Sequence, residues 1–295
     1  MQQAKSIQIP DSSSRHTLQA WLLWATHKLS SANVEAARQN AVELLAHAGK
    51  LSKAKVLAGL DELLPKATGK AFVSLISARS RRVPLQYLLG SEYFDGLTLK
   101  TGRGVLIPRP ETELILEEAK RRLRNEPRLL LDVGTGSGNL ALALAVRYPR
   151  ARVWGLDRSG QALAWAVKNR RLLRLGARVR LCQGTTMPQR WHGKMDLVVS
   201  NPPYIPSSEV SKLQPEVRFE PRLALDGGPD GLTVIRRLLP LVYRLLRPGG
   251  LFVCEIGISQ KAAAWKLFAG AGFSELEARL DWQQIPRVLS GYKPA

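Results

Sequence analysis

An asparagine, two prolines and a tyrosine follow directly on an apolar run, in the order Asn201-Pro202-Pro203-Tyr204. The run from Asp196 to Ser200 is typical of the end of a buried strand, after which the chain would need only a turn. Proline fixes its own backbone angle and donates no hydrogen bond, so the carbonyl oxygens before and within the proline pair are free to point into a cavity. The Asn201 side chain offers another carbonyl oxygen, and the Tyr204 ring offers a flat face for packing.

These acceptors suit a planar NH₂ group, which has two donors. We therefore predict that Asn201, Pro202, Pro203 and Tyr204 bind the substrate, and that Asn201 and Tyr204 are catalytic.

An amide or exocyclic amine nitrogen is a poor nucleophile because its lone pair is conjugated. Hydrogen bonds to both of its N–H groups favour a pyramidal nitrogen and aim the lone pair, and orientation of this kind supplies much of such a barrier. No strong base is required, and the four histidines accompany neither residues 201–204, called the proline segment below, nor the glycine-rich loop at residues 134–138. The structural alternative is a proline-rich turn that only ends a strand.

The second segment that could do chemistry is the loop Gly134-Thr135-Gly136-Ser137-Gly138, which follows the apolar run Leu129–Val133. Glycines allow backbone angles and a close ligand approach that a β-carbon would block. The next apolar run ends at Asp157, whose carboxylate can accept hydrogen bonds from both ribose hydroxyls of a nucleoside. The GxGxG spacing and the lack of a GK[ST] ending favour a cofactor without a pyrophosphate, and S-adenosylmethionine is the obvious candidate. The predicted cofactor-binding residues are Gly134, Thr135, Gly136, Ser137, Gly138, Asp157 and Asn201.

The third apolar run is followed by Gln183-Gly184-Thr185-Thr186. Many methyltransferases have an acid here, near the adenine amino group. Thr185 or Thr186 would have to serve in its place, and the residues do not decide between them.

The elements that must position these segments alternate between strand and helix from Arg128 onward. Strands are expected at 128–133, 152–157, 178–183, 195–200 and 250–256, and helices at 138–148, 160–175, 231–246 and 259–272. Such alternation predicts an α/β fold with a parallel sheet covered on both faces. Stretches 274–280 and 285–290 are expected to pair antiparallel at the sheet edge. In this order the first and fourth strands are neighbours, so the glycine loop and the proline segment should face one cavity.

The residues before this region have a different pattern. Residues 15–82 show helical spacing of apolar residues, with Trp21 and Trp24 as core candidates. Asp95-Gly96 between 91–94 and 97–100 is a strong hairpin signal, and a helix is expected to end near Arg124. We therefore expect a helical domain at 1–84, a hairpin linker at 85–110 and an α/β domain at 111–295.

Composition limits the class of protein. The chain has 295 residues, of which 45% are hydrophobic, and 44 Lys+Arg against 24 Asp+Glu give a net charge of +20. An excess of positive charge bears on binding partners and solubility rather than on the fold. Three explanations stay open, which are binding of nucleic acid, binding of an acidic protein and a generally basic proteome. No apolar run is long enough to cross a membrane, and the start MQQAKSIQIPDSSS has no apolar signal core. Two scattered cysteines fit the cytoplasm and make no metal site.

Several longer motifs stand in order along the chain. They are Pro84–Gly90, Val105–Glu113, Asp132–Gly138, Ser200–Ile205, Glu216–Pro221, Ala224–Leu232 and Glu255–Gly257. Together they resemble the peptide chain release factor glutamine methyltransferases, from about residue 17 to residue 290. The resemblance implies a Rossmann-like S-adenosylmethionine-dependent methyltransferase sheet, a small helical bundle before it and a joining β-hairpin.

The resemblance also implies an activity. The enzyme would methylate the side-chain amide of the glutamine in the Gly-Gly-Gln motif of release factors, with S-adenosylmethionine as methyl donor. Independently of the resemblance, we expect a cytoplasmic protein that is a monomer. The helical domain would dock the release factor. Segment Pro108–Glu113 would form a wall of the site, where Arg109 and Glu111 either order the wall or make a structural ion pair.

Other activities remain open at this point. A related family methylates a glutamine of a ribosomal protein, although its counterparts of the Pro108–Glu113 segment and the glycine loop differ. A nucleic-acid amino-methyltransferase would share the proline segment and suit the charge, but no base-recognition domain is evident. A binder that keeps the fold without catalysis is the third alternative. Basic residues on the helix expected after Asp157 are interpreted by default as a solvent-exposed face, and contact with an acidic protein or with ribosomal RNA is the functional alternative.

Overall fold

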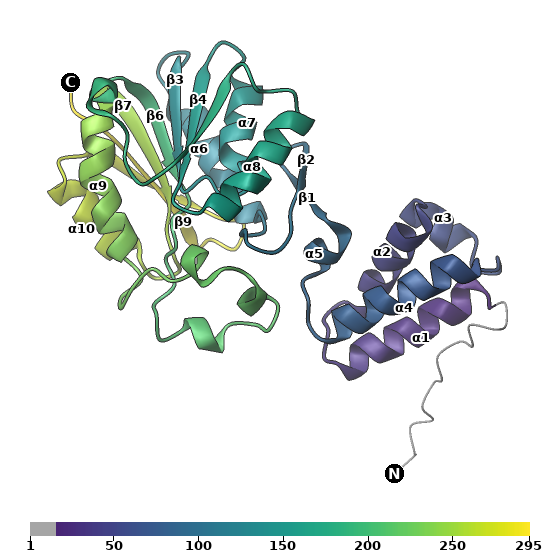
Figure 1. Ribbon diagram of the computed structural model, residues 1–295. Coiled ribbons are helices and arrows are strands. Elements are labelled where there is room, and N and C mark those ends of the chain that lie inside the picture. Colours follow the sequence, from purple (N-terminus) through teal and green to yellow (C-terminus); the bar gives the residue numbers. More distant parts are fainter. Residues whose placement is uncertain (1–15) are drawn as a thin grey trace. The chain divides into compact units, whose positions relative to one another are not determined.

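The computed structural model describes residues 16–295, so the predicted absence of a signal core concerns residues that lie outside this range. The described residues form two compact units (Figure 1). One contains the chain up to Gly90 together with Pro215–Phe219, and the other contains Ser91–Gln214 and Glu220–Ala295. Between residues 16 and 295, no helix is both long and apolar enough to cross a membrane.

The first unit is helical, as its apolar spacing predicts. Its helices are α1 (Leu18–Ser31), α2 (Ala37–Gly49), α3 (Lys53–Ala58), α4 (Lys66–Ser80) and α5 (Leu85–Leu89). Trp21, Trp24 and Phe72 are buried and meet edge to face in its core, which confirms the two tryptophans as core residues.

Segment Pro215–Phe219, which contains the 3₁₀ turn η4 (Val217–Phe219), belongs to this first unit. Glu216 binds Arg79 and Arg82 at 2.8 and 2.6 Å. Both guanidinium groups therefore hold a residue that is far away in sequence.

The second unit begins with the expected hairpin. Strands β1 (Ser91–Phe94) and β2 (Leu97–Lys100) pair antiparallel. Asp95 and Gly96 both have positive φ angles, 48° and 77°, as the tight two-residue turn requires.

A seven-stranded sheet forms the centre of the second unit, in the order β5-β4-β3-β6-β7-β9-β8. The strands are β3 (Leu129–Val133), β4 (Arg152–Asp157), β5 (Val179–Gln183), β6 (Met195–Ser200), β7 (Leu246–Glu255), β8 (Ser274–Leu280) and β9 (Pro286–Tyr292). The first five are parallel, and β9 and β8 are antiparallel at the edge. The predicted α/β class and antiparallel edge are confirmed, and the strands lie near their predicted positions except that β7 begins at Leu246 rather than at residue 250.

Helices cover both faces of this sheet (Figure 1). They are α6 (Glu113–Arg122), α7 (Asn139–Arg147), α8 (Gly160–Leu172), α9 (Thr233–Leu245) and α10 (Lys261–Gly270). Helices α6 and α7 share one buried apolar cluster, and α9 and α10 share the other. The remaining 3₁₀ turns are η1 (Pro110–Thr112), η2 (Gln189–Trp191), η3 (Val210–Lys212) and η5 (Arg222–Ala224). Since β3 and β6 are paired, the loops after them lie side by side at the carboxyl edge.

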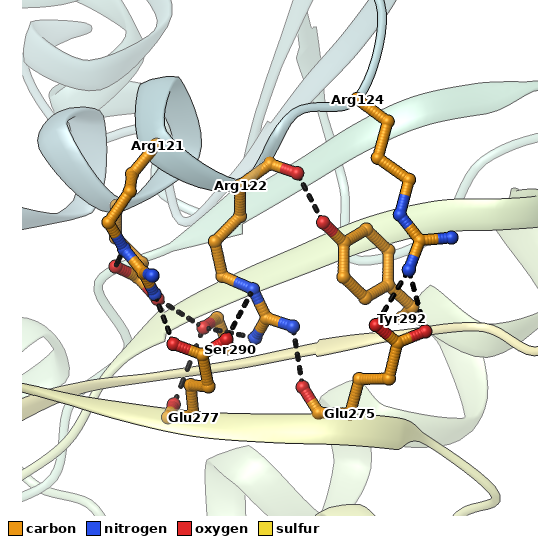
Figure 2. A network of polar contacts seen from close by, with 8 residues as sticks. Arg121, Arg122, Arg124, Glu275, Glu277, Ser290 and Tyr292 are labelled. Atoms are coloured by element: carbon orange, nitrogen blue, oxygen red, sulfur yellow. Dashed lines mark hydrogen bonds and ion pairs between the residues drawn. The ribbon is translucent and has the colours of Figure 1, made fainter.

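Polar contacts fix the carboxyl end of α6 to strands β8 and β9 (Figure 2). The buried Arg122 donates to Ser290 Oγ at 2.9 Å and to the Glu275 carbonyl at 2.6 Å. Tyr292 donates its hydroxyl hydrogen to the Arg122 carbonyl, and its ring packs under that guanidinium. The opposite end of α6 begins directly after Thr112, beside the pocket described next.

Candidate active site

A cavity of about 210 Å³ opens at the carboxyl edge of the sheet, within the second unit. Its walls include three predicted cofactor residues of the glycine loop, together with Asp157 and Asn201–Pro203. The structure therefore brings the glycine loop and the proline segment to one cavity. The predicted site residues that do not line it are Thr135, Gly138 and Tyr204.

The backbone of the glycine loop adopts positive φ angles, which residues with a β-carbon rarely adopt. Gly134, Gly136 and Gly138 have φ angles of +78°, +55° and +85°, in the left-handed region that glycine adopts without strain. Asp157 Oδ2 accepts the Gly136 N–H at 2.8 Å, and its Oδ1 accepts the Ser159 N–H at 2.8 Å. Each oxygen keeps a second lone pair, so Asp157 orders the loop and can still accept from a ligand.

Thr135 belongs to the loop, and its side chain bonds to the preceding strand β3. Its hydroxyl donates to Asp132 Oδ2 at 2.6 Å, and both residues are buried. Burial raises the pKa of Asp132 to about 7, against the opposing effect of the hydrogen bonds from Thr135 and the Ala141 N–H. Gly138 is the residue before α7, where an added β-carbon would lie 3.1 Å from Leu142 Cδ1. Thr135 and Gly138 therefore stabilise the conformation of the loop without lining the cavity.

The proline segment is connected to a buried carboxylate. Asn201 Nδ2 donates to Thr112 Oγ1 at 2.8 Å, and Thr112 Oγ1 is 2.7 Å from Glu255 Oε2. Tyr204 donates its hydroxyl hydrogen to Glu255 Oε1 at 3.0 Å. Among residues 16–295, no donor reaches the backbone carbonyls of Asn201 and Pro202 or the side-chain oxygen of Asn201. These oxygens are thus available as acceptors.

The pKa values of Glu255 and Tyr204 both differ strongly from their ordinary values. Glu255 is 1% exposed, and burial raises its pKa to about 7, although hydrogen bonds from Thr112 and Tyr204 act in the opposite direction. Burial, and then the nearby Glu255 charge, raise the pKa of Tyr204 well above its ordinary value. The phenol of Tyr204 therefore stays protonated and donates.

Glycines of the segment after η5 pack directly on the backbone of the proline segment. A β-carbon at Gly227 would lie 2.6 Å from the Gly231 carbonyl oxygen and 2.8 Å from that of Pro203. The Tyr204 carbonyl accepts a hydrogen bond from Gln260 Nε2 at 2.9 Å. The peptide planes of residues 203–204 are therefore fixed from two sides.

The Pro108–Glu113 wall has its own buried carboxylate. Glu220 accepts the Ile107 N–H at 2.8 Å and a hydrogen bond from Arg109 Nη2, and its side chain is 1% exposed. Burial raises the pKa of Glu220 although Arg109 counteracts this effect. Arg109 therefore orders the wall through Glu220, and no hydrogen bond or ion pair joins it to Glu111 among the described residues.

Three residues here were absent from the predicted site: Thr112, Glu220 and Glu255. Each lies inside a motif that the sequence analysis quoted, Val105–Glu113, Glu216–Pro221 and Glu255–Gly257, but their pairings join residues 89 to 143 positions apart. Thr185 lines the cavity whereas Thr186 does not. No group of three His, Cys, Asp or Glu within residues 16–295 could hold a metal ion.

The chain matches two described sequence families. Residues 20–90 match the "PrmC N-terminal domain", and residues 110–219 match the "Methyltransferase small domain". The release factor glutamine methyltransferase of Moorella thermoacetica is 45% identical over 279 residues, which span 94% of this chain and 99% of that protein. The one of Geobacter sulfurreducens is 40% identical over 276 residues, or 93% and 96%.

Solved structures agree on the fold. The hMettl16 catalytic domain, in complex with a MAT2A 3′UTR hairpin, superposes with a TM-score of 0.57 at 16% identity, over 74% of this chain and 81% of that one. A methyltransferase from Pyrococcus furiosus gives a TM-score of 0.51 at 19% identity, over 68% and 90%. At these identities the likeness concerns the fold alone.

Proposed function

The chain belongs to the family of release factor glutamine methyltransferases, and from this premise we propose how its pocket acts. The enzyme transfers a methyl group from S-adenosylmethionine to the side-chain amide nitrogen of the glutamine in the Gly-Gly-Gln motif of release factors. The observation that carries the proposal is the shared cavity, which is lined by the glycine loop and by Asn201 and Pro202, whose carbonyl oxygens meet no hydrogen-bond donor within residues 16–295.

The residues present fit the cofactor. The left-handed glycine turn leaves room for close approach of a ligand, and Asp157 keeps acceptor lone pairs for ribose hydroxyls. Leu140, Leu156 and Ala162 give the same cavity apolar walls for an adenine ring. Of the two threonines that the sequence leaves open, we propose Thr185 as the neighbour of the adenine amino group. When bound, the cofactor supplies a methyl group activated by a sulfonium.

The proline segment holds the substrate amide. Asn201 Oδ1 and the Pro202 carbonyl accept the two N–H hydrogens, which returns electron density to the nitrogen and aims its lone pair. Tyr204 keeps its ring in place through its bond to Glu255. The nitrogen held in this way would accept the methyl group that the cofactor supplies, which would leave the cofactor as a neutral thioether, and the surplus proton would be lost from nitrogen to water. No residue has to act as a strong base.

We further propose that the first unit docks the release factor, that the protein works as a monomer and that the reaction takes place in the cytoplasm. The net charge of +20 favours an acidic face on the partner. A ribosomal protein is the second candidate substrate, because the same pocket would accept any exposed glutamine on a flexible loop.

The test uses the full-length protein and radiolabelled cofactor. We expect label in purified release factor and none in a variant whose Gly-Gly-Gln glutamine is replaced by alanine. Parallel reactions contain DNA, RNA and ribosomal protein. Label in nucleic acid alone would refute the proposal, and label in ribosomal protein alone would move the activity to the second candidate.

Asn201→Ala tests the role of the proline segment in the enzyme itself. Loss of Oδ1 should lower turnover by about 100-fold or more, because one of two orienting acceptors is gone, whereas cofactor affinity by calorimetry should change by less than about fivefold. Turnover at the normal rate would contradict the role given to this segment.

A further inference from the structure

A chain of hydrogen bonds leads from the pocket into the interior of the second unit. It starts at Asn201, continues through Thr112 and ends at Glu255, with donor–acceptor distances of 2.8 and 2.7 Å. Asn201 and Thr112 both line the pocket, although Thr112 is almost fully buried, whereas Glu255 is 1% exposed and does not line it. Tyr204 holds the other oxygen of Glu255. Each carboxylate oxygen of Glu255, the inner end of this series of hydrogen bonds, is thus held by one hydroxyl group.

The hydrogen-bond chemistry gives this chain one direction. An ionised carboxylate can only accept, so the single hydroxyl hydrogen of Thr112 must be donated to Glu255. The Thr112 oxygen can then only accept, and its partner on Asn201 must be the NH₂ group. The side-chain carbonyl of Asn201 is left on the opposite side, where no donor among residues 16–295 reaches it.

We propose that Thr112 and Glu255 are positioning residues that fix the Asn201 amide in one of its two orientations, with Oδ1 presented to the substrate nitrogen. The reversed amide would present NH₂ to an NH₂ group, which supplies no acceptor. A carboxylate that never touches the substrate therefore sets which atom the substrate meets. This inference rests on the proposed function, which it deepens.

Several charged or titratable groups influence Glu255. Glu111 raises its pKa, Arg287 lowers it, and the Thr112 and Tyr204 hydroxyls favour its charged form. The thiol of the adjacent Cys254 is buried and its pKa is raised by burial. A protonated Glu255 could donate to Thr112 and free that hydroxyl to donate to Asn201 Oδ1, so the chain would lose its direction in acid.

The kinetic test compares three substitutions. Thr112→Val removes the hydroxyl at nearly constant shape, and Thr112→Ser keeps it. Thr101→Val is the matched control, because Thr101 is also buried but its hydroxyl has no hydrogen-bond partner in the described part of the chain. For Thr112→Val we expect turnover to fall between about 5-fold and 100-fold, as for a buried polar group that loses its partner. Cofactor affinity should stay within about twofold. Thr112→Ser should restore most of the turnover, and Thr101→Val should not alter it.

The pH profile and a spectroscopic measurement address the same orientation. Turnover of the natural protein should fall as the pH drops below about 7, and Thr112→Val should lack this acid limb. The chain has six asparagines, so ¹⁵N-labelled asparagine gives few side-chain NH₂ signals, and Asn201→Asp identifies the one of Asn201. In the natural protein this signal should exchange slowly with water and titrate with Glu255. In Thr112→Val both properties should be lost.

The outcomes separate this inference from the proposed function. The inference is overturned if Thr112→Val leaves the Asn201 signal unchanged, if Thr112→Ser is as impaired as Thr112→Val, or if cofactor affinity falls in parallel with turnover. Absence of methyl transfer by the natural protein would refute the proposed function instead. The Asn201 signal would still report on the amide orientation in that case, because it needs no substrate.

Discussion

The carboxylate of Glu255 should destabilise the fold at neutral pH. Its pKa is raised from 4.5 to about 7, so the native state holds this proton more tightly than the unfolded chain does. Below about pH 4.5 both states are protonated, and this group costs nothing. As the pH rises through 7 the native state must carry a buried charge. The interval between the two pKa values corresponds to about 3 kcal/mol of unfolding free energy.

Glu255→Gln measures this cost, because glutamine has the shape of the neutral acid. We expect the unfolding free energy of the variant, relative to the natural protein, to rise by about 3 kcal/mol between pH 4.5 and pH 8. In a unit of this size that difference corresponds to a change in melting temperature of roughly 6–12 °C. Scanning calorimetry at several pH values gives the comparison, and all other ionisable groups cancel because both proteins share them.

Glu118→Gln is a control of opposite sign. Burial alone would raise the pKa of Glu118, but hydrogen bonds from Arg121 and Ser290 lower it overall. The charged form of Glu118 therefore stabilises the native state at neutral pH, and this contribution is lost as the pH falls through its lowered pKa. The variant should be less stable than the natural protein near pH 8, by an amount that shrinks in acid. A Glu255→Gln difference that does not vary with pH, or that favours the natural protein at high pH, would refute the reasoning.

Two further predictions concern packing. Gly227→Ala puts a β-carbon within 2.8 Å of the Pro203 carbonyl oxygen, so the backbone of the proline segment must shift. Turnover should fall about tenfold or more with little change in cofactor affinity, and a fully active variant would show that this segment tolerates displacement. Arg122→Met removes the bonds to Ser290 and the Glu275 carbonyl, so urea unfolding should show a loss of about 2–4 kcal/mol. A loss below about 0.5 kcal/mol, the range of ordinary surface substitutions, would contradict the importance assigned to this network.

The strands and helices of the second unit were predictable because their patterns are local. Short apolar runs that end at Gly134, Asp157 and Asn201-Pro202 predicted β3, β4 and β6 to within about a residue, and Asp95-Gly96 predicted the hairpin. The α/β alternation then predicted that the loops after β3 and β6 share an edge, and both line the same cavity.

The buried carboxylates were not predictable in their roles. Glu220 and Glu255 are paired with residues 113 and 143 positions earlier, and no local pattern encodes a partner at that distance. Arg109 illustrates the difficulty, because the sequence places Glu111 nearby whereas the fold brings it Glu220. The direction of the Thr135 hydroxyl, toward Asp132 beneath the loop, likewise depends on how the strand meets the helix. For the same reason the place of Pro215–Phe219 in the first unit followed only from the fold.

Helix α6 connects the antiparallel edge of the sheet to the wall of the cavity. It is roughly 15 Å long, with Arg122 held by β8 and β9 at one end and Thr112 directly before its other end. A tilt of about 4° about the anchored end would move Thr112 by about 1 Å, and a misplacement of that size can cost about 100-fold in rate. The contacts of Arg122 at the antiparallel edge of the sheet involve no residue that lines the cavity, yet loosening them should displace Thr112 and slow catalysis.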